Sequence, residues 1–297
     1  MKLFFLTLCL FTLFLMTNKA ECDHQDEDDT RSVEPVRITL APTQPKDSPK
    51  LSEKLYGIKF KDILVPETVL ISKGSFNMGQ KDPNIGCYGC SADEQPVHRV
   101  ELTAFEIGRF EVTNAQYLPF AIATGRENAE WRQFFKRGRE NYPVVNISWT
   151  DAQSYCAWLQ SITGKEYRLP TEAEWEYSSR AETANLYIFG NELSNKEANF
   201  RNKDGAVQVG KYKPNRFGLY DTLGNVWEWC SDWYNEGYYS KSPEKNPQGP
   251  SSGQFKVLRG GSWLTNLYET RVANRACHNT GFILDGRGLR VAASIGE

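Results

Sequence analysis

The chain has 297 residues and a formal net charge of −2, and 40% of its residues are hydrophobic and 13% aromatic. So small a charge over this length gives no indication of a broad electrostatic interaction with nucleic acid or anionic lipid, and we expect no nucleic-acid partner. From residue 66 to residue 297 the chain reads as one domain, which is large but within the range of single domains.

The first segment, residues 1–20, predicts a secretory signal peptide. Lys2 precedes an apolar run from Leu3 to Met16, and polar residues ending at Ala20 follow; the run is too short to span a bilayer. Residues 21–65 contain the acidic stretch DHQDEDD and then Pro, Thr, Ser and Lys, a composition typical of a disordered tether. We therefore expect an exported protein, periplasmic or secreted, without stable membrane insertion.

Turn residues bound three strand candidates in the domain, at Val69–Met78, Arg99–Ile107 and Lys256–Leu258. Most of the remaining chain is rich in aromatic residues, glycine and asparagine, which argues against a regular parallel sheet. The pattern predicts an α+β domain in which long ordered loops form much of the surface.

Three helices are marked by their first residues. One is expected over Thr113–Thr124, and a second opens with the capping-box pair Thr150 and Gln153 and closes at Gly164. The third opens directly after Pro170, where Thr171 and Glu174 repeat the same box.

Six cysteines remain once Cys9 is removed with the signal peptide, namely Cys22, Cys87, Cys90, Cys156, Cys230 and Cys277. An even number in an exported chain favours disulfides over free thiols. Cys87 and Cys90 fit a local disulfide loop, a redox pair or half of a metal site. The first is favoured, because no second C-x-x-C completes a zinc site.

Three motifs carry a resemblance to a known family: RLPTEAEWEY from Arg168, GLYDTLGNVWEW from Gly218 and VLRGGSW from Val257. With GSFNMG at Gly74 and GLRVA at Gly288, the chain resembles the formylglycine-generating enzymes, also called sulfatase-modifying factors, over nearly the whole domain. The resemblance implies that family's variant of the C-type lectin fold, which is α+β and low in regular secondary structure. These motifs are specific for fold and much less specific for activity.

The resemblance also implies two structural calcium sites in loops, where carboxylate and carbonyl oxygens are the preferred ligands. In DTLGNVWE the matching residues are Asp221 and Glu228 by carboxylate, and Gly224 and Val226 by carbonyl. In ANFRNKDGA they are Asn199 and Asp204 by side chain, and Phe200 and Ala206 by backbone oxygen. The alternative for DTLGNVWE is a capped turn before a tryptophan-rich core segment.

The family's oxidases convert a sulfatase cysteine to formylglycine with molecular oxygen and a copper(I) ion, which two cysteines after the RGGS motif hold. The matching positions here are Thr265 and Thr270. Copper(I) is soft and needs thiolate or thioether ligands, whereas a threonine hydroxyl is hard and stays protonated. We therefore expect no copper site. If the protein is an oxidoreductase of this family, its catalytic residues are unknown.

The other motif residues are predicted to be architectural. Glu172, Glu174 and Glu176 are explained by helix capping and by burial against Arg168 or Arg180. Gly260 and Gly261 fit a backbone turn. Core anchors are expected at Trp175, Trp227, Trp229 and Trp263. Cys277 is expected to form a disulfide with Cys156 or Cys230.

Three functions fit these patterns. The first is a family member that uses the former active-site groove to bind an extracytoplasmic protein, peptide or small polar ligand, or to assist a partner's maturation. The second is a formylglycine-generating oxidase acting on a sulfatase cysteine, and the third is a C-type-lectin-like recognition protein. Arg271, with Trp263 and Tyr268, is expected to contact a polar or anionic ligand. The full predicted groove is Trp263, Thr265, Asn266, Tyr268, Thr270, Arg271 and Arg275.

Overall fold

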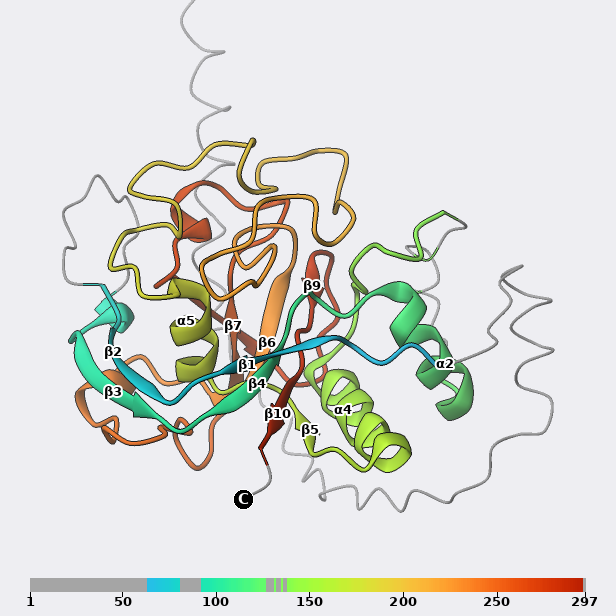
Figure 1. Cartoon of the computed structure of the whole chain (residues 1–297), viewed down its shortest axis with the longest axis horizontal. Helices are drawn as coiled ribbons and strands as arrows, with labels where there is room; N and C mark the ends of the chain where they lie inside the picture. Colours follow the sequence, from blue (N-terminus) through green and yellow to red (C-terminus); the bar gives the residue numbers. More distant parts are fainter. Residues whose placement is uncertain (1–62, 81–91, 127–130, 132–134, 136–137, 296–297) are drawn as a thin grey trace, which may run out of the picture. The chain divides into compact units, whose positions relative to one another are not determined.

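The computed structural model describes residues 63–80, 92–126, 131, 135 and 138–295. The predicted signal peptide, nearly all of the predicted tether, and Cys22, Cys87 and Cys90 lie outside the described residues. Short strands and few helices are joined by long loops, the longest of which joins α5 to β6 over residues 181–226 (Figure 1). This confirms the α+β class. Within the described residues, no helix combines the length and the apolar character needed to cross a membrane.

Helices α2 and α5 begin at the predicted caps. In α2 (Asn114–Thr124), the Thr113 hydroxyl accepts from the backbone N–H of Gln116, whose side chain accepts from Thr113 in return. In α5 (Glu172–Arg180), Thr171 and Glu174 cap each other in the same way. Local sequence is sufficient here, because a capping box satisfies donors within a single turn of helix.

The cap of helix α4 (Trp149–Thr163) lies two residues before the predicted one. It is Ser148, whose hydroxyl accepts from the backbone N–H of Asp151, while the Asp151 carboxylate accepts from Ser148. Thr150 lies inside the helix and donates to the Thr280 carbonyl at 3.3 Å. The predicted box at Thr150 and Gln153 was wrong, because Ser148 and Asp151 form an equivalent box with a charged partner. The predicted end at Gly164 is confirmed.

Three sheets contain the strands that the structure describes. The first has the antiparallel order β1 (Thr68–Ile71), β4 (Phe105–Gly108), β10 (Ala292–Ser294) and β5 (Tyr167–Arg168). The second pairs β2 (Gly74–Met78) with β3 (His98–Leu102). The third has the order β8 (Arg275–Asn279), β7 (Phe255–Arg259), β6 (Trp227–Trp233) and β9 (Arg287–Gly288). The RGGSW motif therefore leaves the third sheet at the end of β7, and the segment with both threonines connects β7 to β8.

Two predicted strands are each divided between two sheets. The segment Val69–Met78 covers β2 and most of β1, and Arg99–Ile107 covers most of β3 and β4. At the second break, the backbone N–H of Thr103 donates to Asn246 Oδ1 at 2.9 Å. The breaks lie opposite each other, since β1 pairs with β4 and β2 with β3. The two segments thus change sheets together, which their local composition does not reveal.

The tryptophans of the motifs are buried, as predicted, and the ring nitrogens of two of them donate hydrogen bonds. Trp175 Nε1 donates to Glu228 at 2.6 Å, and Trp229 Nε1 donates to the Ile147 carbonyl at 3.1 Å. Trp227 and Trp263 are buried as well. Each ring adds a large apolar area to the core, and the N–H groups of Trp175 and Trp229 also attach the core to Glu228 and Ile147.

The cysteine pairing expected for Cys277 was wrong. Cys156 on α4 and Cys230 on β6 are buried free thiols. Cys277 on β8 is disulfide-bonded, but to neither of these two residues. Burial raises the pKa of Cys156 to about 12 and raises that of Cys230 as well. Both thiols therefore stay protonated and unreactive at neutral pH.

Candidate functional site

The connection between β7 and β8 places the two threonines side by side. Gly260 and Gly261 have φ angles of 96° and 80°, and a Cβ on Gly261 would lie 3.0 Å from Thr265 Oγ1. Glycine is therefore required at this predicted turn. The 3₁₀ segment η3 (Tyr268–Thr270) returns the chain, and the hydroxyl oxygens of Thr265 and Thr270 are 3.4 Å apart. The positions matched to the family's cysteines thus share one site, which we call the threonine turn, residues 262–270.

Backbone groups of the threonine turn engage both hydroxyls. Thr265 Oγ1 accepts from the Ser262 N–H at 2.9 Å and donates to the Ser262 carbonyl at 2.8 Å. Thr270 Oγ1 donates to the Asn266 carbonyl at 2.8 Å. A neutral hydroxyl bonded in this way does not replace a thiolate, so these residues do not fit copper(I). The turn is a hydrogen-bonded loop and lacks the ligands of a soft-metal site.

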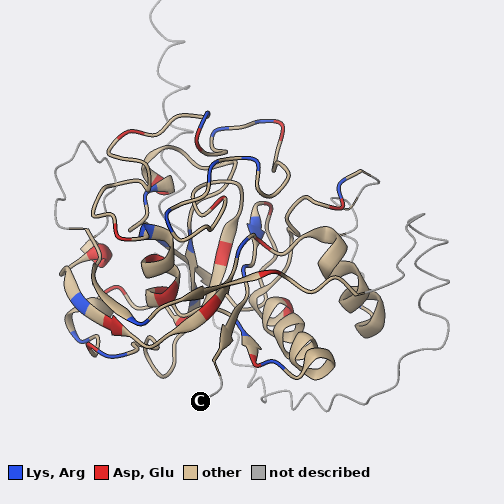
Figure 2. Cartoon of the chain, in the orientation of Figure 1, with Lys and Arg blue, Asp and Glu red and all other residues tan. Residues whose placement is uncertain are grey.

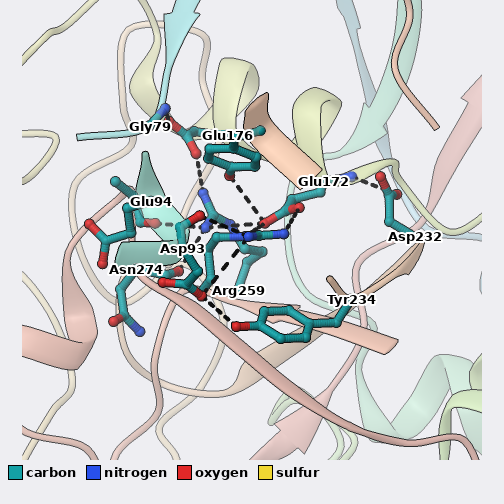
Figure 3. A network of polar contacts seen from close by, with 12 residues as sticks. Gly79, Asp93, Glu94, Glu172, Glu176, Asp232, Tyr234, Arg259 and Asn274 are labelled. Carbon is teal, nitrogen blue, oxygen red and sulfur yellow. Dashed lines mark hydrogen bonds and ion pairs between the residues drawn. The ribbon is translucent and has the colours of Figure 1, made fainter. Parts of the chain in front are cut away.

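A buried network of arginines and carboxylates surrounds α5 (Figure 3), the helix on which Figure 2 shows several acidic residues. Glu176 accepts from Arg180 Nε at 2.8 Å and from the Gly79 N–H at 2.9 Å, and it pairs with Arg259. Burial alone would raise the pKa of Glu176, but Arg180 and Arg259 lower it below its ordinary value. The prediction that this glutamate is architectural fits its contacts.

The other two glutamates of α5 are also paired. Glu174 accepts from Arg168 in two bonds of 2.6 and 2.7 Å, and Glu172 accepts from Arg275 at 2.7 and 2.9 Å. Such bidentate pairs hold both side chains in one orientation and also stabilise their charged forms. Arg275 is therefore a structural residue that attaches the start of β8 to α5.

Arg271 must be corrected from a ligand-facing to a structural residue. It is 1% exposed, and it donates to the two carboxylate oxygens of Glu94 at 2.7 and 2.6 Å. Its Nε donates to the Tyr268 carbonyl at 2.9 Å. Because the guanidinium is satisfied inside the protein, it attaches the threonine turn to η1 (Ala92–Glu94) and does not face a ligand.

The other predicted groove residues differ in exposure. Tyr268 is 38% exposed, and Leu264, which was not part of the predicted groove, is 60% exposed, so the turn presents two apolar side chains to solvent. Asn266 Oδ1 accepts from the N–H groups of Tyr268 and Glu269, which makes this side chain part of the turn itself. Thr265 and Thr270 are buried beneath them.

A pocket of about 380 Å³ lies beside the threonine turn. Trp263 and Leu264 line it from the turn, Asn114 lines it from α2, and Tyr142 lines it from the segment that follows. This volume falls within the range of small-molecule sites. Of the predicted groove, only Trp263 lines this pocket; Asn114 and Tyr142 were missed, because no motif joins them to the turn.

In the DTLGNVWE loop, one of the two predicted carboxylates is already paired. Glu228 accepts from Arg290 at 2.7 and 3.0 Å and from Trp175. Asp221 is buried; its Oδ2 accepts from the Gly210 N–H, and its Oδ1 has no hydrogen-bond partner among the described residues. The loop therefore fits a cation in part, since Asp221 offers an unpaired oxygen while Arg290 neutralises Glu228.

Three buried residues that the sequence analysis did not assign complete this region: Glu111, Asn225 and Arg290. Asn225 Nδ2 donates to Glu111 Oε2 at 2.8 Å, and its Oδ1 accepts from Asn199 at 3.1 Å. Burial, together with the carboxylates of Asp221 and Glu228, raises the pKa of Glu111 well above its ordinary value. The Gly-Asn pair in LGNV is a turn signal that points to Asn225; nothing in the sequence marks Glu111.

The ANFRNKDGA loop is held by asparagine side chains. Asn199 Nδ2 donates to the Gly205 carbonyl at 3.1 Å, and Asn202 Nδ2 donates to Asn199 Oδ1 at 2.8 Å. The Phe200 carbonyl, a predicted ligand, accepts from Asn195 at 2.6 Å. Asp204 is exposed and lines the pocket together with Ala206. Internal hydrogen bonds close this loop, and a calcium ion here stays a prediction.

Calcium is expected to stabilise the protein through Asp221. At a hundredfold excess over its dissociation constant, an ion that binds only the folded state adds about 2.7 kcal/mol, or roughly 5–10 °C in melting temperature for a domain of this size. Thermal unfolding with calcium and with a chelator measures this difference. In Asp221→Asn the two curves should coincide, whereas exposed Asp204→Asn should leave most of the difference. Identical wild-type curves would return this loop to the capped-turn interpretation.

Asp232 is expected to make stability depend on pH. Burial, and then the nearby Glu172 carboxylate, raise its pKa from 3.8 to about 7. The folded carboxyl thus holds its proton more tightly than the unfolded one, so this stabilisation is present at low pH and is lost as the pH rises through about 7. The free energy of unfolding of Asp232→Asn, relative to that of the wild type, should therefore rise by roughly 2–4 kcal/mol from about pH 4 to about pH 8. Urea unfolding of the wild type and of Asp232→Asn across this pH range measures the difference, with exposed Glu236→Gln as the control. The prediction is contradicted if the free energies of unfolding of the wild type and of Asp232→Asn change with pH in parallel.

Comparison with known proteins shows to which family the chain belongs. Residues 58–295 match the Sulfatase-modifying factor enzyme 1-like domain. The chain belongs to this family. The formylglycine-generating enzyme of Streptomyces coelicolor is 35% identical over 288 residues, which cover 75% of this chain and 88% of that protein. The structure of PvdO from Pseudomonas aeruginosa aligns with a TM-score of 0.68 and 32% identity, over 77% of this chain and 95% of that chain. The predicted variant of the C-type lectin fold is thereby confirmed.

Two further relatives bear on activity. A bovine relative named inactive C-alpha-formylglycine-generating enzyme 2 is 30% identical over 291 residues, covering 77% of this chain and 88% of that protein. Serine/threonine-protein kinase pkn1 of Chlamydia pneumoniae is 35% identical over 252 residues. The match covers 78% of this chain and only 38% of that kinase. This chain is thus similar to a relative named inactive, and it spans less than half the length of the kinase that it matches.

Proposed function

We propose that this protein is a copper-independent member of the sulfatase-modifying factor family, which binds an extracytoplasmic partner at the threonine turn and assists its maturation. The observation that carries the proposal is the pair of hydroxyls at Thr265 and Thr270, 3.4 Å apart and bonded to backbone groups. The two positions that match the family's cysteines are thus side by side, but they lack the thiolates that copper(I) requires.

Exposed apolar side chains at this turn support a binding role. Leu264 and Tyr268 project from a turn that buried ion pairs hold in place. A rigid loop loses little conformational entropy on binding, and tyrosine is among the residues that contribute most of the energy of protein interfaces. The exposed leucine adds apolar area beside it. The extracytoplasmic location rests on the signal peptide predicted for residues 1–20.

The oxidase activity is tested first, with the purified full chain, copper(I), oxygen and a peptide carrying the cysteine of a sulfatase. Mass spectrometry is expected to show the peptide cysteine unchanged, because no thiolate pair is present at the turn. Copper-dependent conversion of that cysteine to an aldehyde would establish the oxidase instead and remove the proposal.

Partner binding is tested with a double variant, Leu264→Asp with Tyr268→Asp. Both side chains are exposed, so the melting temperature should stay within about 2 °C of the wild type, while the amount of captured native partner falls at least about tenfold. Leu70→Asp is the matched control, since Leu70 is 63% exposed on β1, outside the turn. Equal capture by the double variant and the control would remove the turn as the binding surface.

A further inference from the structure

The pocket beside the threonine turn contains both signs of charge. Arg139 and Lys203 line it, and so do Asp204 and Asp285. In the part of the chain that the structure describes, no ion pair joins either cation to either carboxylate. The Arg139 guanidinium instead lies over the Tyr142 ring, 5.0 Å from its centre. Opposite charges that share a pocket without neutralising each other are free to interact with a ligand.

A buried acceptor in the same pocket lacks a donor. Asn114 is 2% exposed; its Nδ2 donates to the Arg139 carbonyl at 2.9 Å, and its Oδ1 has no partner within the described residues. This oxygen is closed off from solvent, so a ligand N–H or O–H reaches it only after the pocket wall shifts. The hydrogen bond gained would offset the roughly 1–3 kcal/mol that a buried unpaired oxygen costs.

The balance of charges narrows the ligand class. An anion such as sulfate would meet Asp204 and Asp285 as well as the two cations, and a simple cation would meet Arg139 and Lys203. A molecule with one ammonium and one carboxylate can pair with the two carboxylates and with the two cations at the same time. Its ammonium also supplies the donor that Asn114 lacks. Tyr142 and Trp263 add aromatic surface for an apolar part of the ligand.

We propose that this pocket binds a small zwitterion, either a free amino acid or a short peptide with both ends free. The carboxylate pairs with Arg139 and Lys203, and the ammonium pairs with the carboxylates and Asn114 Oδ1. The inference rests on the proposed function, because it names the ligand class recognised beside the same turn. It replaces the polar or anionic ligand predicted for Arg271.

The experiment is a calorimetric titration of the full chain with four probes. These are glycyl-tyrosine with both ends free, its N-acetyl form, its C-terminal amide and free tyrosine. We expect the free dipeptide to bind, and each blocked form to bind about tenfold more weakly or worse, since each loses one charged hydrogen-bonded pair. Tighter binding of free tyrosine than of the dipeptide assigns the pocket to an amino acid, and the reverse assigns it to a peptide.

Two pocket variants assign the charges. Arg139→Gln should remove the preference for the free dipeptide over its amide and leave the preference over the N-acetyl form, and Asp285→Asn should do the opposite. Exposed Lys213→Gln is the matched control. The proposal is overturned if no probe binds, if the blocked forms bind as tightly as the free dipeptide, or if both variants keep both preferences. None of these outcomes affects the oxidase assay, which tests the proposed function separately.

Discussion

Replacing both threonines by cysteine, Thr265→Cys with Thr270→Cys, is expected to create a copper(I) site in the threonine turn. The two hydroxyl oxygens are 3.4 Å apart, so two sulfurs at these positions lie within reach of one ion. Thiolates are the ligands that copper(I) prefers. A competition titration with a chromophoric copper(I) chelator, under anaerobic reducing conditions, should show one more bound ion per chain than the wild type.

Thr265→Ser with Thr270→Ser is the matched control, because it keeps both hydroxyls, and it should bind no copper(I) at the turn. Cys156 and Cys230 give no background, since burial raises the pKa of both thiols. The other four cysteines of the predicted mature chain, Cys22, Cys87, Cys90 and Cys277, are shared by all variants, so copper(I) bound to them is measured in the serine variant and subtracted. The account of the turn fails if the reduced cysteine variant binds no more copper(I) than the serine variant.

Arg259→Met is expected to have the largest effect on stability. Arg259 is fully buried; it pairs with Glu176 and donates to the carbonyls of Val272, Ala273 and Asn274 at 2.8–2.9 Å. Methionine fills similar space but leaves a buried carboxylate and the carbonyls without this donor. Removing one partner of a buried pair costs roughly 3–5 kcal/mol, which lowers the melting temperature by about 6–20 °C.

Arg216→Met is the matched control, because the same substitution at an exposed arginine should change stability by less than about 0.5 kcal/mol. Arg259→Lys keeps the charge but loses the planar fork, so an intermediate loss is expected and remains measurable if the methionine variant does not fold. Chemical denaturation of the three variants gives the comparison. A loss for Arg259→Met no larger than that of the surface control would show that the network around α5 carries little stability.

The sequence predicted the features that depend on neighbours along the chain. Two helix caps, at Thr113 and Thr171, and the glycine turn at Gly260 and Gly261 follow from groups only a few residues apart. The cap of α4 was misplaced for the same reason, because Ser148 and Thr150 each begin a plausible box and only packing decides between them.

Features that depend on distant partners were not predictable from this sequence alone. Arg271 resembles a surface residue in a polar segment, but it is buried against Glu94, which lies 177 positions earlier. The pocket likewise joins Asn114 and Tyr142 to Trp263 across more than a hundred residues of chain. Such contacts depend on how the sheets and loops pack, which local patterns do not specify.

The hydrogen bonds of Thr265 and Thr270 have a consequence for the conditions under which the protein works. This loop is closed by hydrogen bonds from hydroxyls to its own carbonyls, and these groups are not oxidised or reduced under ordinary conditions and hold no metal ion. Its shape is therefore the same in air and in the absence of oxygen, and with copper abundant or scarce. A thiol centre in this place would change form with each of these surroundings, whereas this turn presents one fixed surface in all of them.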